Sequence, residues 1–137
     1  MRSFRFIVCA LAVALAAGCG SNLLTTRGRV VKGGAPFKPG PGEFVRVTFV
    51  PVLAPGKRAE DYYVAEYNAE DGTFQVAGKD RKGMPPGKYR VAVELDKSRA
   101  DLLKGRFNAD NSPFVYDVDS STPEIVIDLD RPPAKSS

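Results

Sequence analysis

Hydrophobic and polar residues alternate along most of the chain beyond residue 26, and this alternation predicts short β-strands. The clearest case is residues 44–53 (FVRVTFVPVL), in which Val45, Val47 and Phe49 share one face and Arg46 lies on the other. Side chains that alternate with a period of two belong to a strand with one buried and one exposed face. The same pattern predicts further strands at residues 27–32, 62–67, 73–77, 88–95, 114–118 and 124–129.

Segments rich in glycine and proline separate these strands and indicate turns and loops. Residues 68–72 (NAEDG) predict a hairpin connection with Gly72 at a positive φ. Residues 38–43 (KPGPGE) predict an exposed loop, because proline lacks the amide donor that a sheet interior requires. Residues 98–104 predict one short helix, because a serine can cap its start and a glycine can close its end. About seven strands and one helix predict a single all-β domain, folded as a sandwich.

The order of the motifs resembles the carboxypeptidase regulatory-like, or transthyretin-like, family of immunoglobulin-like sandwiches. The motifs that carry the resemblance are GRVVKGGAP, a strand ending FVP, DGTFQV, PPGKYRVAV, DLLKGRF and NSPFVYDV. The resemblance covers residues 27–129, and it implies a non-catalytic module that stabilises, displays or binds. The proline- and glycine-rich insertion after Pro36 departs from the family pattern, in which the next strand follows quickly.

The first residues have the pattern of an export signal. Arg2 and Arg5 are basic, and residues 6–17 are uncharged and apolar. About twelve apolar residues are too few to span a bilayer and fit the apolar core of a signal peptide. The small residues before Cys19 resemble the lipobox of bacterial lipoproteins. That resemblance implies cleavage between Gly18 and Cys19 and a diacylglycerol with further acyl lipid, such as palmitate, on Cys19.

We therefore divide the chain into four parts. The parts are a signal peptide at residues 1–18, a tether at 19–26, the sandwich at 27–130 and a disordered tail at 131–137. Ala16 replaces the leucine that is usual three residues before the lipidated cysteine. An ordinary secretory signal that happens to end near a cysteine is the alternative interpretation.

Composition excludes several classes of function. Cleavage leaves 119 of the 137 residues and 18 basic against 16 acidic side chains, so the mature charge is near +2 and gives no reason to expect nucleic acid as a partner. The chain has no histidine, which excludes Ser–His and Cys–His nucleophile activation and imidazole-ligated metal sites. With one acylated cysteine, no intramolecular disulfide is possible. We expect no catalytic residue, no metal and no cofactor other than the covalent lipid.

Two pairs of acids are spaced as they would be on one strand face, Asp117 with Asp119 and Asp128 with Asp130. Paired carboxylates can hydrolyse glycosidic bonds when their separation and pKa values are suitable. These four lie near strand ends beside serine, threonine or proline, which favours a solvated surface instead.

A calcium site receives little support from the sequence. An EF-hand loop aligned on Gly72 does not match, because Tyr67 and Ala69 take positions that need oxygen ligands and Gly78 takes that of the bidentate acid. Asp101, Asn108 and Asp110 leave a looser site open, although turn formation explains them better.

Three tyrosines and two basic clusters are the candidate ligand surfaces. Tyr62, Tyr63 and Tyr67 lie on one predicted strand, where they form either a platform for sugar rings or part of the core. The basic clusters are Lys57–Arg58 and Lys79/Arg81/Lys82. If their loops share one end of the sandwich, these clusters could contact anionic lipid headgroups or envelope polysaccharide.

These observations together predict a lipid-anchored protein of the bacterial cell envelope. Its main expected activity is binding or assembly with another envelope protein, through a sheet edge or the insertion loop. The alternative is a carbohydrate-binding module that uses Tyr62, Tyr63 and Tyr67. Gly20 follows the anchor where some Gram-negative lipoproteins of the inner membrane carry aspartate, so the outer membrane is favoured.

Overall fold

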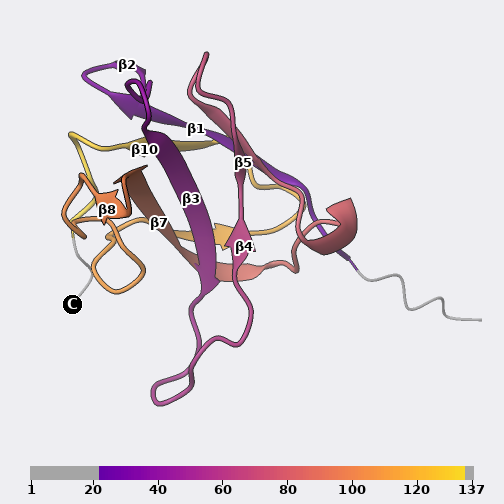
Figure 1. Cartoon of the computed structure of the whole chain (residues 1–137). Coiled ribbons are helices and arrows are strands. Elements are labelled where there is room, and N and C mark those ends of the chain that lie inside the picture. The colour runs from indigo at the N-terminus through magenta and orange to yellow at the C-terminus, as the bar shows by residue number, and fades with distance from the viewer. Residues whose placement is uncertain (1–21, 135–137) are drawn as a thin grey trace, which may run out of the picture.

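The computed structural model describes residues 22–134, which fold into two β-sheets packed face to face (Figure 1). One sheet contains, in order, β10 (Ile125–Asp128), β1 (Thr26–Lys32), β6 (Thr73–Val76) and β5 (Glu66–Tyr67), with β2 (Ala35–Pro36) also paired with β1. The other contains β4 (Tyr63–Val64), β3 (Phe44–Pro51), β7 (Gly87–Lys97) and β8 (Ala100–Asp101), with β9 (Val115–Val118) also paired with β7. The predicted all-β sandwich is confirmed.

The antiparallel pair of β3 and β7 is the longest ladder in the molecule. It runs from Phe44 opposite Asp96 to Pro51 opposite Tyr89 without a break. The apolar face predicted for each strand is the buried one, with Val47 and Phe49 of β3 fully enclosed. The largest fully buried side chains are Phe49, Phe107, Phe114, Met84 and Ile127.

Strand β1 lies at the centre of the other sheet, antiparallel to β6 and parallel to β10. Gly28 permits this arrangement, because a Cβ at that position would lie 2.3 Å from Phe74 Cζ and 2.4 Å from the carbonyl oxygen of Ile125. Such distances are far below ordinary van der Waals contact. Glycine is therefore required where the ring of Phe74 packs directly onto the backbone.

The strand predicted at residues 62–67 divides between the two sheets. β4 pairs with β3 at Thr48 and Phe49, whereas β5 pairs with β6. Ala65 stands at the crossing point, where it is buried and its N–H donates to the Val47 carbonyl at 2.8 Å. The segment forms one corner of the sandwich, which a strand confined to one sheet could not do.

The helix predicted at residues 98–104 is wrong. Ser98 and Arg99 have positive φ values of 49° and 70°, and they form the two-residue turn that joins β7 to β8. Such turns match the twist of the paired strands and exclude a right-handed helix at the same residues. A short 3₁₀ helix, η1 (Lys79–Arg81), instead lies between the strands predicted at residues 73–77 and 88–95.

Candidate binding surfaces

The strand pairings give the sandwich two ends. At the N-terminal end, Thr26 lies opposite Val76 in one sheet, and Pro51 lies opposite Tyr89 in the other. This end carries residues 22–26, 51–63, 76–89 and 118–125. The distal end carries residues 31–44, 67–73, 95–102 and 128–131. In Figure 1, η1 and the start of the described chain lie side by side at the right.

The first described residues are fixed to the N-terminal end. Leu24 and Met84 form a β-bridge in which each N–H donates to the other carbonyl at 2.8 Å. Met84 is completely buried, so the bridge is anchored to the core. A Cβ on Gly83 would lie 2.6 Å from the Leu24 carbonyl oxygen, which shows how closely the two segments pack. Gly18, Cys19 and the predicted signal peptide lie outside the described residues.

The three candidate tyrosines do not form one exposed surface. Tyr63 is half buried with its ring edge-on to Tyr89, at a centroid distance of 6.0 Å. The hydroxyl of Tyr67 donates to the Phe37 carbonyl, and burial raises the pKa of Tyr67 to about 12. Tyr62 alone is largely exposed, at 63%. Tyr63 and Tyr67 serve chiefly as packing residues, which leaves Tyr62 available to a ligand.

Tyr62 lies at a shallow depression on the outer face of the sheet that contains β3 and β7. Its volume is about 470 Å³. The lining residues are Arg46, Thr48, Tyr62, Val64, Ala92, Glu94, Asn108, Ala109 and Asp110. An aromatic ring next to carboxylate, guanidinium and amide groups is the combination that can stack on a sugar and bond its hydroxyls.

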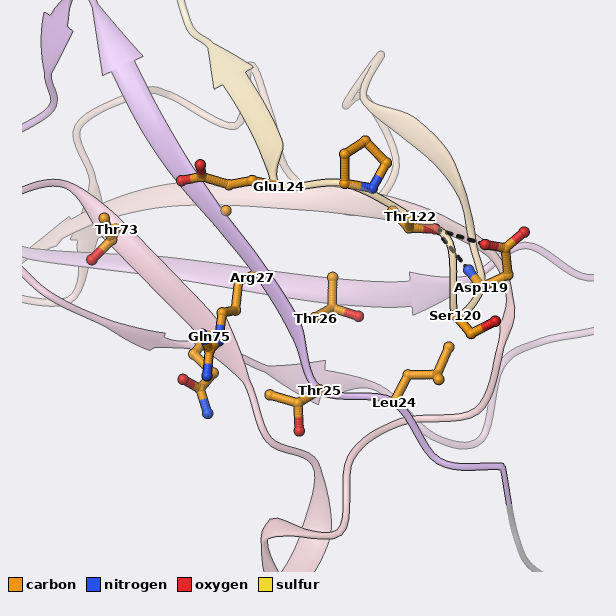
Figure 2. A pocket seen from close by; sticks show the side chains of 12 residues that line it. Leu24, Thr25, Thr26, Arg27, Thr73, Gln75, Asp119, Ser120, Thr122 and Glu124 are labelled. Atoms are coloured by element: carbon orange, nitrogen blue, oxygen red, sulfur yellow. Dashed lines mark hydrogen bonds between the residues drawn. The ribbon is translucent and has the colours of Figure 1, made fainter.

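A second groove, of about 750 Å³, lies at the N-terminal end between β1, β6 and the loop after β9 (Figure 2). Its lining residues are Leu24, Thr25, Thr26, Arg27, Gly28, Thr73, Gln75, Asp119, Ser120, Thr122, Pro123 and Glu124. Hydroxyl and amide groups dominate this lining. Within the turn after β9, the Asp119 N–H donates to the Thr122 hydroxyl at 2.8 Å, and that hydroxyl donates to the Asp119 carboxylate at 3.4 Å (Figure 2).

Three of the four acids considered as catalytic pairs stabilise turns. The Asp119 carboxylate accepts the N–H and hydroxyl of Ser121 at 2.8 and 2.6 Å, and these bonds lower the pKa of Asp119. The Asp128 carboxylate accepts the Asp130 N–H at 3.0 Å, and Asp130 in turn accepts the Gly33 N–H at 2.5 Å. These contacts give Asp119, Asp128 and Asp130 structural roles in surface turns.

The looser calcium site is likewise explained by turns. The Asp101 carboxylate accepts the N–H groups of Leu95, Leu103 and Gly105 at 3.0, 2.9 and 2.8 Å. The Asn108 side chain accepts the N–H groups of Asp110 and Asn111. Within residues 22–134, no cluster of three or more acidic, cysteine or histidine side chains could hold a metal ion.

The two basic clusters lie at the same, N-terminal end. Lys79 pairs with Asp61 at 2.9 Å, and Arg81 approaches Glu66 at 4.0 Å. The remaining three, Lys57, Arg58 and Lys82, form no ion pair within the described part of the chain. A groove of about 620 Å³ separates the two loops, and its lining includes Val52, Leu53, Lys57, Arg58, Tyr63, Pro85, Pro86 and Tyr89.

The two sheets expose different edges. On β10, the Val126 carbonyl accepts a hydrogen bond from the Tyr116 hydroxyl at 3.3 Å, which occupies one of the edge groups. On β3, the pairing with β4 covers only Thr48 and Phe49, so residues 44–46 have no strand beside them on that side. Phe44, at this free edge, is the most exposed large hydrophobic residue in the described chain, at 71%.

The loop that leads into this edge is stabilised by the carboxylate of Glu43. Glu43 accepts the Gly40 N–H at 2.8 Å and the Lys97 ammonium at 3.3 Å, and the bond from Gly40 contributes most to lowering the Glu43 pKa. The insertion after Pro36 is therefore an ordered feature beside Phe44. The sequence predicted the loop and the strand, but it gave no signal that β4 would leave half of β3 uncovered.

Comparison with known proteins adds no family to these observations. No family model, curated protein or solved structure matches the chain significantly. Among residues 22–134, no helix has the length and apolar character needed to cross a membrane.

Proposed function

We propose that this chain is a lipid-anchored protein of the bacterial cell envelope whose sandwich binds another envelope protein without catalysis. The order of basic, apolar and small residues before Cys19 supports the anchor. The turn-stabilising roles of Asp101, Asp119 and Asp128 support a binding module over an enzyme. Outer-membrane placement follows from Gly20 under the same proposal.

The free edge of β3 is the observation that carries this proposal. An unpaired edge can accept a strand from another protein, because its backbone N–H and carbonyl groups lack partners. Phe44 adds a large apolar side chain, and aromatic residues commonly anchor protein interfaces. Both lie at the distal end, away from the N-terminal segment that would hold the lipid, so a partner can reach them.

Site-specific crosslinking in living cells tests this proposal. A photoreactive amino acid replaces Phe44 in the full-length protein, and a matched variant carries it at Val126. Val126 is half exposed on β10, where Tyr116 occupies part of the edge. We expect one dominant protein adduct from position 44, little from position 126, and loss of that adduct when Cys19→Ala removes the anchor.

Two outcomes contradict the proposal. Equal adducts from positions 44 and 126 would mean that the β3 edge has no special role. An adduct at position 44 that persists unchanged with Cys19→Ala would mean that the partner does not depend on envelope anchoring.

Carbohydrate binding is a second candidate, favoured by the exposed ring of Tyr62 beside the depression that contains Asn108 and Asp110. Stacking of a sugar on tyrosine needs the ring and not its hydroxyl. We expect binding to envelope polysaccharide to be lost with Tyr62→Ala and retained with Tyr62→Phe, as measured by glycan pull-down. Equal binding by both variants would exclude this surface.

A further inference from the structure

We propose that the N-terminal end of the sandwich lies directly against the anionic phospholipid headgroups of the membrane that holds the anchor. The surface consists of residues 52–62 and 78–88, together called the basic loops. This inference rests on the proposed lipidation of Cys19, and it adds an orientation of the domain to that anchor. The distal end, with Phe44 and the free edge of β3, would then point away from the bilayer.

The length of the tether limits how far the domain can stand from the membrane. Five residue steps separate Cys19 from Leu24, which allow at most about 17 Å in a fully extended chain. Leu24 is fixed to Met84 within the basic loops. β7 alone, with its eleven residues, is about 35 Å long, so the tether is shorter than the sandwich. The basic loops are therefore the part of the domain closest to the lipid.

The charge of the basic loops complements an anionic surface. Residues 52–62 and 78–88 contain six basic and three acidic side chains. The distal segments, residues 32–44, 68–72, 96–101 and 128–131, contain five basic and seven acidic side chains. The N-terminal end also carries Asp119 and Glu124, but Asp119 is bound by its own turn and Glu124 pairs with Arg29 at 2.7 Å.

Four of the six basic side chains are free to meet a phosphate. Lys57, Arg58, Lys82 and Lys88 form no ion pair among the described residues. Basic side chains near an anionic bilayer each contribute attraction that decreases within the screening length of the salt. Within residues 22–134, no carboxylate competes with lipid for these four groups.

Exposed apolar side chains in the same loops give a second point of contact. Val52 and Leu53 are 40% and 45% exposed at the end of β3. The only backbone hydrogen bond within the loop that follows is from Lys57 N–H to the Ala54 carbonyl, at 3.1 Å. Apolar side chains flanked by basic ones are typical of surfaces that enter the boundary between headgroups and acyl chains.

Spin labelling of the lipidated protein in vesicles tests the orientation. Cys9 is removed with the signal and Cys19 is acylated, so an introduced cysteine is the only free thiol. Ala54→Cys places the label on a basic loop, and Ala69→Cys places it on the distal hairpin; both alanines are exposed. A lipid with a nickel-chelating headgroup reports proximity by paramagnetic relaxation, in vesicles of phosphatidylcholine alone or mixed with phosphatidylglycerol.

We expect relaxation to be several-fold stronger at position 54 than at position 69 when phosphatidylglycerol is present. The difference in relaxation between positions 54 and 69 should be smaller in phosphatidylcholine alone and at high salt. In the variant with Lys57→Gln, Arg58→Gln and Lys82→Gln, each removed charge should weaken docking about fivefold. The matched control removes three distal charges, by Lys38→Gln, Arg99→Gln and Arg131→Gln. It should leave the difference in relaxation between positions 54 and 69 unchanged.

The possible failures can be told apart. If the purified protein does not float with vesicles of either composition, the anchor is wrong, and the orientation is overturned with it. If it floats but positions 54 and 69 relax equally in phosphatidylglycerol vesicles, the anchor stands and the orientation alone is overturned. An equal loss of docking in both triple variants would overturn the specific role of the basic loops.

Discussion

The two ends of the sandwich use their charged side chains in different ways. At the distal end, the carboxylates of Glu43, Asp71 and Asp101 all accept hydrogen bonds from backbone N–H groups. At the N-terminal end, Lys57 and Lys82 have no partner among the described residues. Charges that hold turns are part of the folded structure, whereas unpaired surface charges add little to it. The difference indicates that these distal carboxylates contribute to stability, whereas Lys57 and Lys82 are available to a charged ligand.

Removal of the Asp101 carboxylate should have the largest effect, because it is the acceptor for three backbone N–H groups. Asp101→Ala leaves these donors without their partner and should lower the free energy of unfolding by about 2–3 kcal/mol. Urea denaturation followed by circular dichroism measures the change. Asp110→Ala is the control, because this exposed carboxylate holds no turn, and it should change stability by less than about 0.5 kcal/mol. Equal effects of the two variants would contradict the special role of Asp101.

Asp101 also shows where sequence reasoning failed. A serine, an aspartate three residues later and a glycine beyond them are typical of a capped helix, and the same three residue types also suit a hairpin followed by a turn. The choice was made by the pairing of Asp101 with Asp96 across the hairpin, a contact that no local pattern encodes. Regular alternation, by contrast, correctly predicted β3 and β7, because both strands bury one face over their whole length.

The candidate surfaces could be predicted only in part, for a similar reason. The sequence identified the tyrosines and the basic loops as chemical groups. It could not show that Ala65 marks a crossing between sheets, which separates Tyr63 from Tyr67 and uncovers the edge at Phe44. The two basic clusters came together because residues 76–87 connect the two sheets at one end, which is a property of the topology.

Removal of the Tyr67 hydroxyl, also at the distal end, should affect stability less than removal of the Asp101 carboxylate. It is half buried and donates to the Phe37 carbonyl, so Tyr67→Phe should cost about 1 kcal/mol of unfolding free energy. Its folded pKa of about 12 lies above the ordinary value near 10. The contribution is therefore complete below pH 10 and is lost as the pH rises from 10 through 12. Melting temperatures from pH 8 to 12 should fall less in Tyr67→Phe than in the native protein, and parallel curves would contradict this assignment.

Acid should also weaken the distal end, at the opposite end of the pH range from the Tyr67 effect. The hydroxyl and N–H of Thr73 donate to Asp71 at 2.6 and 3.0 Å and lower its pKa. A carboxyl whose folded pKa is depressed stabilises the protein above its unfolded pKa, near 4, and loses that contribution as the pH falls below it. Asp71→Asn should therefore flatten the decline in melting temperature between pH 5 and 2. Glu70→Gln, the neighbouring exposed acid, should keep the native slope, and a slope changed equally by both would contradict the role of Asp71.

The smallest effect on stability is expected at the N-terminal end. Neutralising Lys57, Arg58 and Lys82 together removes charges that stabilise no turn, so the unfolding midpoint in urea should shift by no more than the equivalent of about 0.5 kcal/mol. The same triple variant is the one expected to lose contact with phosphatidylglycerol vesicles. A folded, equally stable protein that no longer orients on the membrane would separate binding from stability at this end. A large loss of stability would instead show that these three side chains support the fold, as the acids of the distal end do.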